Sequence, residues 1–503
     1  MNQGAPLRFP FSICLRATTM PTPIRQSSAI TLWMLLVLLL VIPPLGLLVG
    51  KTSATLSIGI VVALLIFIGS FVNAQFAIYV LIFATLLSPE FGSRSTSGSG
   101  VTIRLDDFLL LLIGFSQLAK TAVYKQVGLF SWTPINRYIT YYMLACIIST
   151  GVGILSGRVR SLTGFFFVLK YFEYFIVYFM VINNLDSKAQ AKRYLVAILL
   201  TAAIVSLVAI AQIPKGGRVA APFEGEDGEP NTLGGYLLLI ASAVSGLLFV
   251  RDALDRLTHK LLLGGLLGLL TIPILFTLSR ATWLAAVPAM LGFLFLSDRK
   301  MLMGLIIAAG IVVAPVVLPQ AVWDRILYTT EEQQNKWARR GQESIGGVTF
   351  DTSTSARIRE WKAVVEDFPQ HPIIGFGVTG WHFIDAQYFK VLIETGFVGI
   401  ITFFMLLWAI IRHTWHTYKT AREPLFKGLA LGFLVGTFSM MVHATMTNTF
   451  IIVRIMEPFC LLMAIVIAVP SLEETEMTTE GAPEQSRENR QHVPLPGSIV
   501  RSL

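Results

Sequence analysis

The chain has 503 residues, of which 54% are hydrophobic and 14% are charged, with a mean hydropathy of +0.68 and a net charge of +9. A soluble globular protein carries about 25% charged residues, so the composition excludes a soluble protein. In a soluble chain the positive charge would suggest nucleic-acid binding, whereas here basic cytoplasmic loops of a membrane protein explain it.

Apolar segments follow one another along the chain, each near the roughly 20 residues that a helix needs to cross a bilayer. Helices are expected because they satisfy their own backbone hydrogen bonds in lipid. We therefore predict an all-α polytopic membrane protein with a bundle of about 12–14 transmembrane helices. The segments are residues 31–49, 54–70, 71–87, 105–122, 138–155, 163–182, 194–213, 232–250, 261–278, 282–296, 301–318, 391–411, 428–444 and 450–469.

The first segment, residues 31–49, is too long for a signal peptide and lacks a clear cleavage site, so we interpret it as a membrane helix. Residues 54–87 form either two short helices or one long kinked helix. The three cysteines do not form a disulfide framework or a zinc motif, and we expect no metal and no cofactor. They are Cys14, Cys146 and Cys460.

Lys and Arg are concentrated in alternate loops, which places both termini in the cytoplasm by the positive-inside rule. The predicted domains are a cytoplasmic tail, an N-terminal transmembrane bundle, a large extracytoplasmic loop, C-terminal transmembrane helices and a disordered cytoplasmic tail. Their bounds are residues 1–29, 30–318, 319–390, 391–469 and 470–503. Within the large loop, apolar residues recur at helical spacing over residues 355–368, so the loop is predicted to be partly helical.

Three arginines on the predicted outer side of the membrane are candidates for binding an anion. Arg280 lies between two apolar segments, Arg218 lies in a Gly-rich outer loop, and Arg357 shares a predicted helix with Arg359. Each has a simpler explanation: snorkelling to the headgroups for Arg280, a solvated loop charge for Arg218 and the surface of an amphipathic helix for Arg357. Together they would suit a diphosphate, because guanidinium forks match phosphate oxygens.

A segment that follows the predicted loop helix also carries candidate residues. It begins with a Pro-Ile-Ile-Gly-Phe-Gly sequence at residues 372–377, where glycine permits a tight turn. Asp385 follows, and then Tyr388 and Glu394 at the start of the next apolar segment. Asp385 is either a catalytic carboxylate or the cap of that helix.

In this order, these residues resemble the bacterial O-antigen ligase and O-antigen or exopolysaccharide polymerase family. The resemblance covers residues 218–399 best, and Arg104 to Asp107 also open a segment in the way typical of the family. Ligases of the family typically have a histidine where this chain has Asp385, and polymerase-like members are more similar here. The resemblance therefore leaves both polymerase and ligase open.

The resemblance implies a metal-independent enzyme of the cytoplasmic (inner) membrane that acts on its outer face in envelope glycan synthesis, such as that of lipopolysaccharide or exopolysaccharide. Its partners would be a glycan linked to a polyprenyl diphosphate, such as undecaprenyl diphosphate, an acceptor glycan or lipid, and membrane lipids. Arg218, Arg280 and Arg357 would bind the diphosphate. Arg280 and Asp385 would be catalytic, and the supporting contacts would come from Arg359, Trp361, Tyr388 and Glu394.

Two alternatives from other classes remain. A polytopic transporter or lipid-linked glycan flippase would explain the two charges, Lys170 and Glu173, within one apolar segment. However, no pair of Gly- or Pro-broken segments recurs in two halves of the chain, as is typical of transporters. A structural membrane scaffold would leave the outer arginines without a role.

Overall fold

The computed structural model describes residues 54–88, 90–91, 103–123, 131–223, 228–327, 343–345 and 348–480. The chain divides into two units, residues 1–65 and 66–503. The first unit contributes only the start of α2 to the described residues, and everything below concerns the second. The predicted helix at residues 31–49 and the tail at residues 1–29 lie outside the described residues.

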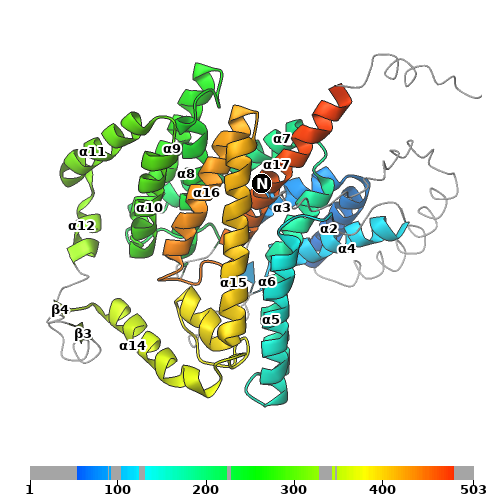
Figure 1. Ribbon diagram of the computed structural model, residues 1–503, viewed down its shortest axis with the longest axis vertical. Coiled ribbons are helices and arrows are strands. Elements are labelled where there is room, and N and C mark those ends of the chain that lie inside the picture. The colour runs from blue at the N-terminus through cyan, green and yellow to red at the C-terminus, as the bar shows by residue number, and fades with distance from the viewer. Residues whose placement is uncertain are drawn as a thin grey trace, which may run out of the picture. The chain divides into compact units, whose positions relative to one another are not determined.

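Helices form nearly all of the described secondary structure (Figure 1). The strands are two short antiparallel pairs, β1 with β2 and β3 with β4. In chain order the elements are α2 (Ala54–Val72), α3 (Ala74–Leu87), β1 (Glu90–Phe91), β2 (Ile103–Arg104), α4 (Leu105–Val123), α5 (Asn136–Leu155), α6 (Ser161–Asn184), α7 (Lys188–Ile210), η1 (Ile213–Lys215), α8 (Pro230–Phe249), α9 (Leu257–Phe276), α10 (Arg280–Leu296), α11 (Lys300–Val317), α12 (Gln320–Leu327), β3 (Ser344–Ile345), β4 (Val348–Thr349), α14 (Thr352–Asp367), η3 (Phe368–Gln370), α15 (Gln387–Thr420), α16 (Pro424–His443) and α17 (Val453–Glu480).

Eight helices of the described residues are long and apolar enough to cross a membrane, or nine if the bent pair α11 and α12 forms one span. These eight are α5, α6, α7, α8, α9, α15, α16 and α17. The other predicted spans from residue 54 onward coincide with α2, α3, α4, α10 and α11. The number of helices long enough to span a membrane is lower than predicted, partly because α3 and α10 have only 14 and 17 residues. The prediction of an all-α, multi-pass membrane protein is confirmed.

The centre of the bundle is the contact between α8 and α16, where glycines let two backbones approach closely. Almost every residue of α8 is buried. A Cβ atom on Gly246 would lie 2.2 Å from the carbonyl oxygen of Gly428 and 2.6 Å from the Cα of Gly432. Small residues at helix contacts are the usual means of close packing in membranes, so this contact fixes the position of α8 and α16.

Several charges inside the bundle pair with one another. Lys170 on α6 lies 3.3 Å from Asp107 on α4, and Arg104 lies 3.0 Å from Asp106. Glu173, one turn from Lys170, lies beside Asp107. Charged groups within membrane proteins are typically paired in this way, so the two charges that the transporter alternative relied on belong to an ionic cluster.

The long helix α15 is broken near its start, at Gly396, where φ is 66° and ψ is −163°. The turn at residues 372–377 packs against the break, and the backbone N–H groups of Phe376 and Gly377 donate to the carbonyl oxygens of Ile393 and Glu394 at 3.0 and 2.8 Å. The turn therefore satisfies the backbone groups that the break exposes. As a result, the segment that carries Asp385 is fixed to the end of the bundle.

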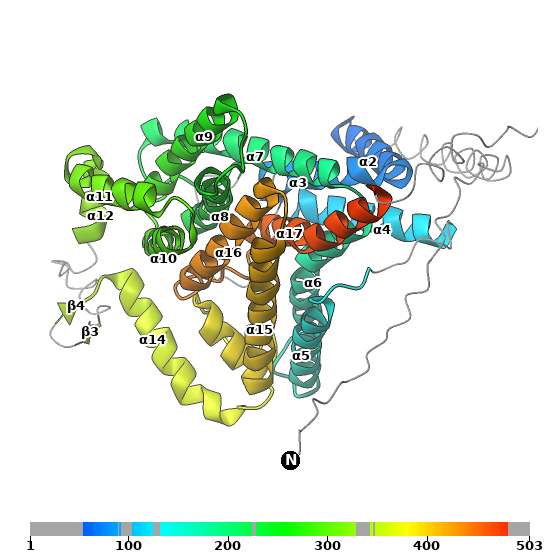
Figure 2. The ribbon, with the colours of Figure 1, turned by 45° about the horizontal axis from the view of Figure 1, so that its top comes forward.

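The segment predicted to be a large outer loop is partly helical, as expected. It contains α12, the pair β3 and β4, and α14, which together with η3 covers the residues predicted to be helical. α14 lies at the end of the bundle where α15 begins (Figure 2). The tail predicted to be disordered from residue 470 begins differently, because α17 continues through Pro470 to Glu480.

Candidate functional site

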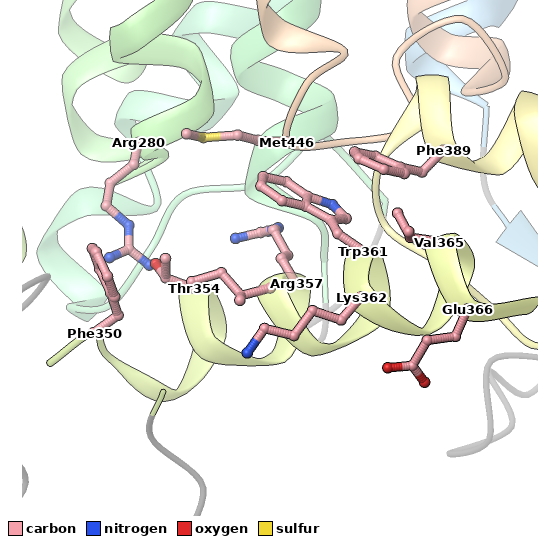
Figure 3. Close-up of a pocket in the computed structure, with 11 residues that line it drawn as sticks. Arg280, Phe350, Thr354, Arg357, Trp361, Lys362, Val365, Glu366, Phe389 and Met446 are labelled. Atoms are coloured by element: carbon pink, nitrogen blue, oxygen red, sulfur yellow. The ribbon is translucent and has the colours of Figure 1, made fainter. Parts of the chain in front are cut away.

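A cavity of about 720 Å³ lies between the start of α10, one face of α14 and the start of α15. Figure 3 shows Arg280 entering it from α10 and Arg357 from α14, with Trp361 and Phe389 on the far side. The cavity therefore brings guanidinium groups and aromatic rings together on its walls. Its lining residues are Arg280, Phe350, Thr354, Arg357, Ile358, Trp361, Lys362, Val365, Glu366, Phe389 and Met446.

Arg280 is held at the mouth of the bundle by a helix start and an ion pair. It is the first residue of α10, whose N-cap Ser279 accepts a hydrogen bond from the backbone of Thr282. Its two terminal nitrogens each lie 2.9 Å from an oxygen of Asp351. Asp351 is also the N-cap of α14, where its side chain accepts a hydrogen bond from the N–H of Thr354. The ion pair therefore joins the bundle to the outer helix.

The pKa of Asp351 reflects this pairing. Burial alone would raise it, but the hydrogen bonds from Arg280 and Thr354 outweigh burial and lower the pKa below its usual value. The carboxylate is therefore ionised at neutral pH, and the side chain is only 1% exposed.

Arg218 lies within electrostatic range of Arg325, Arg280 and Arg357. Just after α9, the carbonyl oxygen of Thr277 accepts a hydrogen bond from Nε of Arg218 at 2.9 Å, and that of Leu278 accepts one from Nε of Arg325 at 3.4 Å. Burial, followed by the neighbouring positive charges of Arg325, Arg280 and Arg357, lowers the pKa of Arg218 to about 10. Three guanidinium groups from other parts of the chain are therefore close enough to act electrostatically on Arg218.

Asp385 forms an ion pair with Arg357. Its Oδ2 is 3.2 Å from Nη2 of Arg357, and its backbone N–H donates to Glu360 at 3.3 Å. Burial raises the pKa of Asp385, although Arg357 and the backbone of Asn448 act in the opposite direction. Asp385 is not among the residues that line the cavity, but its carboxylate contacts Arg357, which does line it. It precedes α15 by two residues, whereas the N-cap of α15 is Ala386, which makes no side-chain cap.

The four residues predicted to give support lie in different places. Trp361 lines the cavity and stacks on Phe389 with ring centroids 5.3 Å apart. Arg359 lies on the exposed side of α14, outside the lining. Tyr388 donates to the carbonyl oxygen of Met441 at 2.6 Å.

Glu394, the last of these four, is buried at the break in α15. It accepts hydrogen bonds from Lys390 at 2.7 Å and from the N–H of Thr379 at 3.0 Å. The contacts of Glu394 and Tyr388 hold the start of α15 in place and do not reach the cavity.

Sequence reasoning missed Arg325 and Asp351. Arg325 lies in the short amphipathic helix α12, a feature that the sequence shows only weakly. Asp351 precedes the Thr-Ser-Thr-Ser run that opens α14, and an Asp before such a run is a recognisable helix N-cap. That signal predicts the cap, but it does not predict the contact with Arg280, which lies 71 residues away in the chain.

The charges around the cavity suit an oxyanion. Arg280, Arg357 and Lys362 line it together with a single acid, Glu366. Guanidinium groups remain charged and bind phosphate oxygens in pairs. Within the described part of the chain, no group of three His, Cys, Asp or Glu side chains is placed to hold a metal ion. The apolar side of the cavity can accept a lipid or the face of a sugar ring.

Comparison with known proteins supports the same interpretation. Residues 265–404 match the model of a family described as O-antigen ligase. The matched range includes Arg280, Arg325, Asp351, Arg357 and Asp385. No curated protein matches the chain. The family match supports the assignment of this protein to the O-antigen ligase family, and with it a glycan-transferring function of the ligase or polymerase type.

Proposed function

From this assignment to the O-antigen ligase family, we propose that the protein transfers a glycan from a polyprenyl-diphosphate carrier to an acceptor hydroxyl. The observation that carries the proposal is the convergence of Arg218, Arg280, Arg325 and Arg357 at one end of the bundle. A cluster of like charges is unfavourable unless an anion neutralises it. A lipid diphosphate has both the charge for this cluster and a tail for the apolar surface beside it.

In the proposed reaction, the acceptor oxygen forms a bond to the anomeric carbon of the donor as the bond from that carbon to the diphosphate oxygen breaks. The bonding electrons go to the leaving polyprenyl diphosphate, whose negative charge rises. Arg280 and Arg357 stabilise that charge from within the cavity, with Arg218 and Arg325 adding to the positive field. Preorganised charge of this kind is commonly the largest contribution to catalysis, and no metal ion is required.

The acceptor hydroxyl must lose its proton in this step, and Asp385 is the proposed base. It lies within 3.2 Å of Arg357, so a diphosphate that binds Arg357 would release Asp385 from this ion pair. Its pKa, which burial raises, favours proton acceptance. Trp361 would contact a sugar ring or the start of the lipid.

The reaction is proposed to take place on the outer face of the bacterial cytoplasmic membrane, with both termini inside. The chain's distribution of Lys and Arg supports this orientation. The four arginines gather at a single end of the bundle, as a site on one face of a membrane requires.

The test uses the purified full-length chain in detergent with a lipid-diphosphate-linked oligosaccharide and an acceptor glycan. Transfer or lengthening of the glycan supports the proposal, because a glycan transferase needs no sealed membrane. A transporter or flippase would produce no covalent product under these conditions. Absence of product with every acceptor, while the oligosaccharide still moves across sealed vesicles, would overturn the proposal.

A polymerase and a ligase differ in the acceptor that receives the glycan. Deletion of the protein in its host would leave short surface glycans if it is a polymerase, and unattached lipid-linked polymer if it is a ligase. The aspartate at position 385 favours the polymerase.

A further inference from the structure

A second cavity, of about 640 Å³, lies among the ends of α6, α15 and α17 and the residues that precede α5. It opens at the opposite end of α15 from the arginine site. About 20 residues of helix separate Gly396 from His416, which corresponds to roughly 30 Å and to the thickness of the hydrocarbon core of a bilayer. With α15 crossing the bilayer, this length would bring the cavity to the level of the other membrane surface.

The side of this cavity formed by α15 is basic. Arg412 and His416 are exposed and His413 is half-buried, and all three line the cavity. Arg137 at the start of α5 lies close enough to act electrostatically on His413. The acid in the lining is Glu474 on α17, so the two arginines leave a net positive charge when the imidazoles are neutral. The imidazole rings add N–H donors beside the guanidinium group.

The rest of the lining is amphipathic. Ile182, Leu185 and Ile467 give an apolar wall, and hydroxyl groups of residues such as Ser131 lie nearby. Trp132 belongs to the lining and is 91% exposed. Tryptophan is enriched at membrane–water interfaces, where its ring lies at the level of the headgroups.

We propose that this cavity binds the headgroup of an anionic phospholipid, with Arg412, His413 and His416 around the phosphate. Basic pockets between helix ends on the cytoplasmic side are a recurrent way of binding such lipids. The apolar wall would contact the first part of the acyl chains, and Trp132 would lie at the headgroup level. The apolar wall and the exposed Trp132 are features that a soluble phosphate would not require, so a membrane lipid is the occupant that the lining favours. The proposal does not depend on the reaction at the arginine site.

The test is native mass spectrometry of the full-length chain in detergent, titrated with phosphatidylglycerol or with phosphatidylcholine. The wild type should bind phosphatidylglycerol at least tenfold more tightly, and Arg412→Gln with His416→Gln should abolish the preference. The control is Arg251→Gln with Arg256→Gln, which removes two exposed arginines from the loop between α8 and α9. This variant should retain the preference for phosphatidylglycerol. Retained helical content and elution volume would show that each variant is folded.

Three results would overturn the proposal. One is equal binding of both lipids by the wild type. Another is an unchanged preference in the variant of Arg412 and His416. The third is displacement of phosphatidylglycerol by millimolar inorganic phosphate, since this would identify a site for a soluble anion.

Discussion

Asp351 holds the guanidinium group of Arg280 by two parallel hydrogen bonds of 2.9 Å each. A phosphate group would bind the same two nitrogens with the same geometry. The donor diphosphate would therefore compete with Asp351 for Arg280. Because Asp351 also caps α14, donor binding at Arg280 would be coupled to the position of that helix.

Replacement of Arg280 by Ala should reduce turnover by about 100- to 1,000-fold, the usual cost of removing one preorganised charge at a reacting centre. Lys should restore only part of it, because an ammonium group cannot bind two oxygens as a fork. Product formation in detergent measures the turnover of both Arg280 variants. The matched control is Arg359→Ala, on the exposed side of α14. Normal turnover from Arg280→Ala at wild-type membrane levels would refute the role in diphosphate binding.

Replacement of Asp351 by Asn should destabilise the protein, because removing one member of a buried ion pair costs about 3–5 kcal/mol. Asn is as good an N-cap as Asp, so this variant tests the ion pair alone, whereas Asp351→Ala also removes the cap. Thermal unfolding in detergent should rank the wild type above Asn and Asn above Ala. Since the pKa of Asp351 is lowered in the folded state, its contribution is present at neutral pH and is lost as the pH falls through that lowered pKa.

The double variant Arg280→Ala with Asp351→Asn provides the check on this pairing. Its destabilisation should be clearly smaller than the sum of the two single effects. Additive effects would mean that the two side chains stabilise the protein independently.

The pH dependence of turnover should have an acid limb set by Asp385. A base must be deprotonated, so the rate should fall as the pH falls through its pKa, and burial places that pKa above the ordinary value of about 3.9. Arg357 lowers the pKa of Asp385, so Arg357→Gln should move the limb to higher pH. Asp385→Asn should remove the limb and reduce kcat more than donor binding. An unchanged limb in Asp385→Asn would assign the base to another group.

Gly396→Ala should disturb the site from a distance. At its φ of 66° an alanine is strained, and its Cβ would lie 2.3 Å from the carbonyl oxygen of Ile373. The turn that holds Asp385 would have to move, so both the unfolding temperature and turnover should fall. The control is Gly264→Ala in α9, where a Cβ meets nothing within 4 Å. Equal effects of the two substitutions would contradict a special role for the break.

Inorganic pyrophosphate should stabilise the wild type, because it relieves the repulsion among the four arginines. At 100 times its Kd, a ligand specific for the folded state adds about 2.7 kcal/mol. The rise in unfolding temperature should disappear in Arg280→Ala with Arg357→Ala and should weaken in high salt. A rise of the same size in this double variant would place the anion elsewhere.

The sequence by itself determined the class of the protein and most of its elements. Helices form at every predicted apolar segment from residue 54 onward, because a backbone in lipid must satisfy its hydrogen bonds within its own segment. The helix within residues 355–368 followed from apolar spacing. Arg280 was chosen because its charge stands between two apolar segments, where charge is costly, and Arg218 and Arg357 were grouped with it because all three were predicted on the outer side.

Only the tertiary structure decided which of these residues meet. Arg325 joined the cluster and Arg359 did not, because the orientation of α12 and α14 against the bundle selects the side of each helix that faces the cavity. Asp351 contacts Arg280, although 71 residues of chain separate them. No local sequence pattern encodes a contact between residues so far apart in the chain. Local sequence fixes a helix because its hydrogen bonds are local, whereas an ionic site depends on packing between helices that are distant in the chain.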